Sequence, residues 1–251
     1  MDGDQRHLTV LRVEAPVADT PLGRARRDFV FGDVWGRPVL GVKDRRLVSL
    51  AGVASTNALS SIDAHVYASL RSGDLTLQEL HEFVLHFAVY CGWPKASQLE
   101  VSVRTQWVRY HEDQGLEAPA WPSLPLDDLG PVALDERLAQ GHRSFEEVNH
   151  MALPLADTPY LHSGVVTFVF GHVWNRPGLT RRERRLITVA CVGASEALTP
   201  IVTHVTAALE SGDVPYEEMQ ELILQFAVEC GFARAQVLSD VAEDWYRSQL
   251  V

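Results

Sequence analysis

The sequence has few residues that would indicate disulfide, metal or phosphate chemistry. It contains three cysteines, Cys91, Cys191 and Cys230, and so low and odd a number is typical of a reducing compartment. Cys91 and Cys230 lie in apolar segments, where a thiol is expected to be a small buried hydrophobic group. No metal-ligand spacing of the HExxH kind and no glycine-rich phosphate loop occurs. The sequence therefore predicts neither a metal nor an organic cofactor.

Basic residues and long apolar runs are also scarce. Acidic residues outnumber basic ones by 33 to 22, giving a net charge of -11, which argues against nucleic acid or an anionic membrane as a partner. No segment has 18 uncharged apolar residues, so no membrane span is expected. The first residues, MDGDQRHLTV, lack the apolar core of a signal peptide, and a cytoplasmic location is expected.

A long internal repeat is the main positive feature of the sequence. Residues 29–99, which begin FVFGDVWGRP, recur without a gap as residues 168–238, which begin FVFGHVWNRP. Self-similarity of this length predicts a duplicated structural unit. We expect a first repeat over residues 1–112 and a second over residues 132–251. The proline-rich segment 113–131 is expected to link them, because prolines at that density cannot continue a helix.

Helical spacing dominates within each repeat. Leu47, Leu50 and Ala54 fall on one apolar stripe, and Thr180 with Glu183 forms a capping box at the start of the equivalent helix. No segment shows a strand period of useful length, so the fold class is predicted to be all-α. Residues 1–28 are expected to wrap the first repeat, with a helix starting after Pro21. The first repeat is expected to contain helices over about 43–55, 60–73, 76–91 and 94–110, and residues 132–151 to add one or two helices without a clear counterpart.

Four motifs recur in both repeats. They are VWxRP (34–38 and 173–177), RRL (45–47 and 184–186), HVxxxLxSGD (65–74 and 204–213) and ELHEFVLHFAVYCGWPKA (79–96, with its twin at 218–235). Together they resemble the carboxymuconolactone decarboxylase family over most of the chain. The resemblance implies an all-helical fold whose single-domain members assemble into rings. The tandem chain would then pack as a pseudo-dimer, and a homo-oligomer of three chains would mimic a hexameric ring.

The family has a peroxidase branch and a decarboxylase branch. The alkyl hydroperoxidase D branch uses Cys-x-x-Cys with a histidine four residues after the second cysteine. Counting back from His65, those positions hold Ala58 and Ser61, and the second repeat also lacks both cysteines. A disulfide relay needs two thiols. The sequence therefore matches the decarboxylase branch, which keeps the histidine and uses no metal or organic cofactor.

His65 and His204 are the leading catalytic candidates, because they recur in both repeats and match the family's histidine. An imidazole can donate or accept a proton near neutral pH. Loss of CO2 from a β-keto or vinylogous acid leaves an enolate, which needs a hydrogen-bond donor and then a proton at carbon. We therefore expect His65 to act as an acid or base on a small carboxylated substrate.

Polar side chains follow one stripe of the next helix in each repeat. Glu82, His86 and Tyr90 share a helix face, whereas Glu221, Gln225 and Glu229 hold the equivalent places. The stripe is either a solvated helix face or part of the site. The sequence predicts that the first repeat's pocket works, with Glu82 orienting His65 through His86 or Tyr90. The catalytic candidates are His65, Glu82, His86, Tyr90, His204 and Glu221.

Arginines open one helix in each repeat, where positive charge opposes the helix dipole. A carboxylate partner is therefore expected. It is either a structural carboxylate of the protein or a substrate carboxylate held by a guanidinium fork. The candidate substrate-binding residues, including two tryptophans that could form pocket walls, are Trp35, Arg37, Arg45, Arg46, Trp174, Arg176 and Arg185.

These observations favour a cofactor-independent lyase that decarboxylates a small, cyclic or lactone acid through an enolate. One alternative is a cofactor-free isomerase, dehydratase or cyclase of secondary metabolism. Another is a non-catalytic small-molecule-binding or assembly protein, whose pockets should be plugged by side chains. The copies differ at several candidate pocket positions, such as Ser61 opposite Pro200, so the two pockets are not expected to be equivalent.

Overall fold

Every regular element is a helix over the residues that the structure, a computed structural model, describes: 1–122, 130–131, 133–154 and 158–250. The all-α prediction is thus confirmed. The first repeat contains α1 (Gly3–Leu11), α2 (Pro21–Ala25), the π-helix η1 (Arg26–Val34), α3 (Val42–Ser55), α4 (Leu59–Ser72), α5 (Leu77–Cys91) and α6 (Trp93–Glu112). The second contains α7 (Leu134–Asn149), the π-helix η3 (Tyr160–Phe170), the short η4 (Val173–Asn175), α8 (Arg181–Ser195), α9 (Leu198–Glu210), α10 (Tyr216–Cys230) and α11 (Phe232–Ser248). No helix in these ranges is long and apolar enough to cross a membrane.

The duplication extends to the N-terminal helix, which the sequence did not indicate. Helix α1 packs on η1 as α7 packs on η3, and a glycine stands at each contact. A Cβ on Gly3 would lie 2.0 Å from the carbonyl oxygen of Arg27, and one on Gly141 would lie 2.1 Å from that of Val166. Residues 132–151, for which the sequence showed no clear counterpart, therefore correspond to α1 in the first repeat.

Replacing Gly141 by alanine is expected to destabilise the protein by about 1–3 kcal/mol, because the added methyl group overpacks a backbone contact. Urea unfolding would measure this loss. Gly164→Ala is the matched control, since a Cβ there meets no atom within 4 Å and alanine favours a helix by about 0.5–1 kcal/mol. Equal losses in both variants would contradict a close contact between α7 and η3.

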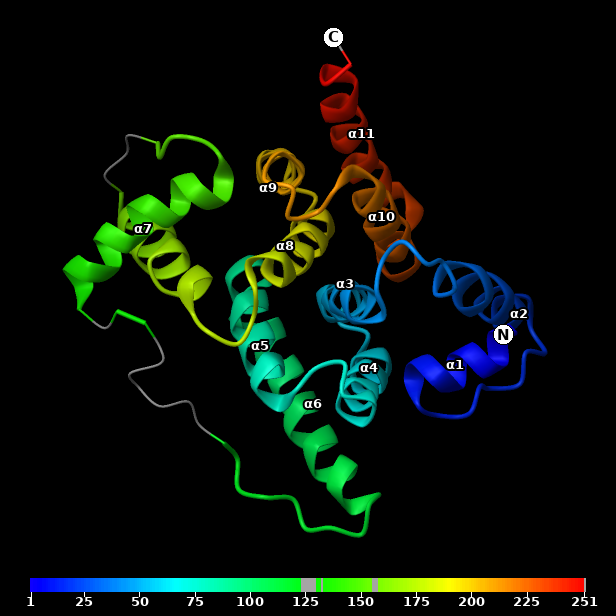
Figure 1. The fold of residues 1–251 in the computed structure, drawn as a ribbon. Coiled ribbons are helices and arrows are strands. Elements are labelled where there is room, and N and C mark those ends of the chain that lie inside the picture. The colour runs from blue at the N-terminus through cyan, green and yellow to red at the C-terminus, as the bar shows by residue number, and fades with distance from the viewer. Residues whose placement is uncertain (123–129, 132, 155–157, 251) are drawn as a thin grey trace.

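The two repeats share one hydrophobic core. Helices α3 and α8 pack against each other, α10 packs on α3, and α5 packs on α8. Figure 1 shows α3 and α8 at the centre of the molecule with α5 and α10 on either side. Leu47 and Leu50 of α3 and Leu186 of α8 are fully buried in the same cluster. The repeats therefore pack as the predicted pseudo-dimer, and each supplies side chains to the other's surroundings.

Candidate active site

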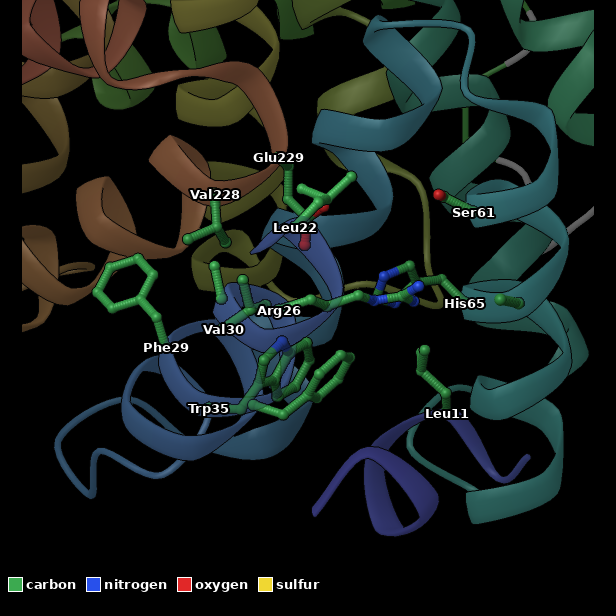
Figure 2. A pocket seen from close by; sticks show the side chains of 13 residues that line it. Leu11, Leu22, Arg26, Phe29, Val30, Trp35, Ser61, His65, Val228 and Glu229 are labelled. Atoms are coloured by element: carbon green, nitrogen blue, oxygen red, sulfur yellow. The ribbon is translucent and has the colours of Figure 1, made fainter. Parts of the chain in front are cut away.

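A cavity of about 280 Å³ lies beside His65 at the contact between the repeats. Helix α4 contributes Ser61 and His65, the η1 region contributes Arg26 and several apolar side chains, and α10 of the second repeat contributes Glu229. Figure 2 shows the Arg26 side chain extending toward His65, with Trp35 and Glu229 on different sides of the space between them. Both repeats therefore contribute to the lining of this cavity.

His65 is held as a neutral imidazole. Its side chain is buried, and Nη1 of Arg46 lies 3.3 Å from its Nδ1. Because a guanidinium only donates hydrogen bonds, Nδ1 must accept and the ring proton must sit on Nε2. Burial, followed by the charges of Arg46 and Arg26, lowers the pKa of His65 well below its ordinary value of 6.5. His65 can therefore offer an N–H donor but is a poor proton reservoir.

Glu229 is the titratable carboxyl of this cavity. Burial raises its pKa to about 7, against the opposing effects of a hydrogen bond with Ser49 and the charge of Arg26. Gly52 makes room for it, since a Cβ there would lie 2.8 Å from the Cβ of Glu229. A carboxyl with a pKa near neutrality can give a proton to a reacting atom and recover it from water.

Glu229 is absent from the residues selected from the sequence, where it looked like a departure from the first repeat's pattern. One signal was available, because it is the sole charged residue within the apolar segment FAVEC. Charged residues are rarely found in such segments without a function or a partner. The sequence alone could not show that this carboxyl faces the histidine of the other repeat.

Arg26 and Trp35 also line the cavity. Arg26 is an exposed residue, and its guanidinium lies 5.6 Å from the centre of the Phe31 ring. Trp35 stacks on His65 with ring centres 6.2 Å apart, and the Arg46 guanidinium lies 5.5 Å from the Trp35 ring. Arg26 forms no ion pair among the described residues, so its charge is available to an anion that enters the cavity beside His65 and Glu229.

A second cavity, of about 630 Å³, surrounds His204 at the equivalent place. The first repeat completes it with Tyr90, whose ring centre lies 5.4 Å from that of His204. Trp174 stacks on His204 and donates from Nε1 to the Tyr90 hydroxyl at 2.9 Å. Both histidines therefore border open space, whereas the scaffold alternative required plugged pockets.

The predicted grouping of His65, Glu82, His86 and Tyr90 in one pocket is wrong. Helix α5 faces α8 of the other repeat, so Tyr90 lies beside His204 and not beside His65. His86 is fully buried, with its Nε2 2.8 Å from Oγ1 of Thr188. The spacing of one helix stripe correctly grouped residues on α5 but could not indicate which histidine they meet.

The buried carboxylates pair with arginines of the opposite repeat. Glu82 binds Arg176 through contacts of 2.6 and 2.9 Å and lies 3.6 Å from Arg184. Glu221 accepts from Nε of Arg37 at 2.6 Å and from Nη2 of Arg45 at 2.7 Å. Neither glutamate lines the two cavities.

Two further arginines have partners within their own repeat. Arg46 pairs with Asp74 at 3.1 Å, and Arg185 pairs with Asp213 at 3.3 Å. The sequence left open whether the arginines bind carboxylates of the protein or of a substrate. In the structure, carboxylates of the protein bind Arg37, Arg45, Arg46, Arg176 and Arg185. The other alternative, a substrate carboxylate held by a guanidinium fork, would need these arginines to give up their protein partners. Trp35 lines the first cavity. Trp174 does not line the second cavity but stacks on His204, which does.

Within the described ranges, no group of three or more histidine, cysteine, aspartate or glutamate side chains is arranged to hold a metal ion. Among the groups that border the cavities, the two imidazoles, the Glu229 carboxyl, the Tyr90 phenol and the Arg26 guanidinium can donate protons or stabilise charge.

The fold and these cavities define a duplicated helical protein with two sites at the repeat contact. The sequence model of the carboxymuconolactone decarboxylase family matches residues 20–100 and 159–244. The chain therefore belongs to the carboxymuconolactone decarboxylase family.

Two curated relatives are similar to part of the chain. A nitrosuccinic acid decarboxylase of Metarhizium robertsii is 35% identical over 91 residues, which are 35% of this chain and 62% of the relative. A 4-carboxymuconolactone decarboxylase of Acinetobacter baylyi is 32% identical over 80 residues, 32% of this chain and 59% of the relative. The similarity thus spans about three fifths of each relative.

Proposed function

We propose that this protein is a decarboxylase that works in the cavity of His65 and Glu229. The observation that carries the proposal is Glu229, a carboxyl with a pKa of about 7 in a cavity that is also lined by a neutral imidazole and a cation. Two relatives named as decarboxylases support the reaction type. These three groups supply the protons and charges that the reaction needs, so we propose no metal or organic cofactor.

The substrate that suits this cavity is a small dicarboxylic acid. A cation that binds the leaving carboxylate would stabilise the ground state, because the negative charge leaves that group during the reaction, and it would therefore not accelerate the reaction. The Arg26 guanidinium is therefore better suited to a second carboxylate that stays in the product. The leaving carboxylate would stand beside a carbonyl or similar group that can accept the electron pair.

The reaction balances with one proton taken up. The bond from carbon to the leaving carboxylate breaks, CO2 departs, and the electron pair forms an enolate. The Nε2–H of His65 donates a hydrogen bond to the enolate oxygen, which is most valuable where the charge develops. Protonated Glu229 then gives its proton to carbon, and the Glu229 carboxylate recovers a proton from water.

A panel of β-keto dicarboxylic acids and lactone carboxylic acids in D2O would test the reaction. We expect release of CO2 and one deuterium at the carbon that loses it. Substrate conversion without CO2 would contradict decarboxylation and favour isomerisation, dehydration or cyclisation. The trimeric ring, the cytoplasmic location and the link to secondary metabolism stay predictions.

Arg26→Met is expected to raise KM for a dicarboxylic substrate about 10–100-fold, since a hydrogen bond to a charged group contributes about 1.5–3 kcal/mol. We expect kcat to change far less, and a monocarboxylic analogue to lose little. The neighbouring Arg27→Met is the matched control, because Arg27 pairs with Asp28 at 2.6 Å and does not line the cavity. An equal rise in KM for both variants would contradict a role of Arg26 in binding the substrate.

A further inference from the structure

We propose that the second cavity is a binding site for an uncharged, largely apolar alcohol, such as an aromatic or alicyclic one, and that it does not bind carboxylates. The inference goes beyond the proposed reaction, because it concerns the space around His204. That space has about 630 Å³, against about 280 Å³ beside His65. A cavity of this size takes a larger molecule than the first cavity does.

Each charged group of the first cavity is replaced in the second. The position equivalent to Arg26 holds Val165, and Tyr90 stands where Glu229 stands. Burial raises the pKa of Tyr90 to about 12 and lowers that of His204 to about 3, so both are neutral at physiological pH. A carboxylate here would lose its water without gaining a cation on the cavity wall, which is costly.

The nearby cation of the second repeat is already occupied. Arg185, whose charge contributes to the low pKa of His204, pairs with Asp213 at 3.3 Å. Its guanidinium lies 5.4 Å from the Trp174 ring, and Trp174 in turn stacks on His204. Arg185 itself does not line the cavity. It therefore cannot take the place of Arg26.

The apolar lining of the second cavity favours an apolar ligand, and Asn149 favours one that carries a hydroxyl group. Phe145, Phe168 and Met151 are among the apolar side chains around the cavity. Asn149, which replaces Leu11 of the first cavity, is 6% exposed, and its Oδ1 has no hydrogen-bond partner among the described residues. A buried acceptor without a partner is unfavourable. A rotation of the Asn149 amide toward the cavity would let it accept a hydrogen bond from a ligand hydroxyl.

Titration with 2-naphthol and 2-naphthoate, two probes of similar shape that differ in charge, tests the proposal. We expect one 2-naphthol site per chain that is weakened at least tenfold by Asn149→Leu and by Val165→Arg, whereas Arg26→Val leaves it unchanged. Val165 is only half-buried and its equivalent is an exposed arginine, so the charge should be tolerated. Circular dichroism would verify the fold of each variant.

The two probes separate this inference from the proposed reaction. Any 2-naphthoate binding by the unmodified chain should be lost in Arg26→Val, and Val165→Arg should create a new 2-naphthoate site. The inference is overturned if 2-naphthol does not bind at millimolar concentration. It is also overturned if Arg26→Val, but not Asn149→Leu, removes 2-naphthol binding, or if 2-naphthoate occupies the His204 cavity of the unmodified chain.

Discussion

Glu229→Gln is expected to lower kcat for decarboxylation about 10²–10⁴-fold, the usual contribution of a general acid, while KM changes little. Glutamine has nearly the same shape and can still interact with Ser49, but it cannot give a proton to carbon. Steady-state assays of CO2 release would measure the effect. The matched control is Glu196→Gln, at an exposed carboxylate that pairs with Arg234 at 2.6 Å, and it should keep full activity.

The pH profile should identify Glu229 as the acid. Since the protonated form is the active one and its pKa is about 7, kcat of the unmodified protein should fall as pH rises through about 7. The residual activity of Glu229→Gln should not follow this titration. A variant that keeps the same profile would contradict the assignment, and so would one that keeps full activity.

Replacing Glu229 by glutamine should lower activity but raise stability at high pH. The folded-state pKa of Glu229 is raised to about 7 from its ordinary value of 4.5, so the unmodified protein loses stability as pH rises between these values. Each unit of pKa difference corresponds to about 1.4 kcal/mol, and the partial exposure of the side chain reduces the total. Glu229→Gln should therefore unfold at higher urea concentration than the unmodified protein at pH 8, with this advantage shrinking at pH 5.

The sequence indicated that the two cavities differ, but it could not show which residues line each of them. The drift between copies indicated two unequal pockets, and the recurrence of His65 and His204 indicated where to look. The partners across the repeat contact could not be assigned, because spacing along α5 or α10 places residues on a face without telling which helix meets that face. Tyr90 and Glu229 consequently lie beside the histidines of the opposite repeats.

Helix α1 shows a different limit of sequence patterns. Its residues differ from those of α7 almost everywhere, yet Gly3 and Gly141 both allow a backbone contact with a π-helix. Arg46 and Arg185 also donate to the carbonyl oxygens of Val10 and Val148 at equivalent places. Backbone contacts place few demands on side chains, so this part of the duplication is conserved in geometry and almost invisible in the sequence.

The arginines illustrate an argument that was sound but incomplete. Positive charge at the start of α3 and α8 does require carboxylates, and the structure supplies Glu221 and Glu82 from the opposite repeat. The helix-dipole argument could not separate a protein carboxylate from a substrate carboxylate, because both satisfy it. Only the packing of α10 on α3 and of α5 on α8 decides between them. Glu221 is thus placed to join the repeats, whereas the proposed proton donor, Glu229, lies two turns further along α10.

Glu82→Gln is expected to destabilise the protein by about 3–5 kcal/mol, because it leaves buried arginine charge without its carboxylate. Glu82 is 1% exposed, and the side chains of Arg176 and Arg184 are 10% and 1% exposed. The matched control is Glu100→Gln, which removes an exposed i,i+4 pair with Arg104 and should cost less than about 1 kcal/mol. Urea unfolding at pH 7 would measure both losses.

A double-mutant cycle with Arg176→Met separates the ion pair from the other effects of each substitution. We expect the Glu82→Gln and Arg176→Met losses to be strongly non-additive, since each removes the same contact between repeats. Additive losses, or a loss no larger than that of Glu100→Gln, would contradict a role of this pair in joining the repeats. The pair holds α5 against α8, and α5 also carries Tyr90 into the second cavity. Glu82→Gln should therefore weaken 2-naphthol binding more than it lowers the rate of decarboxylation beside His65.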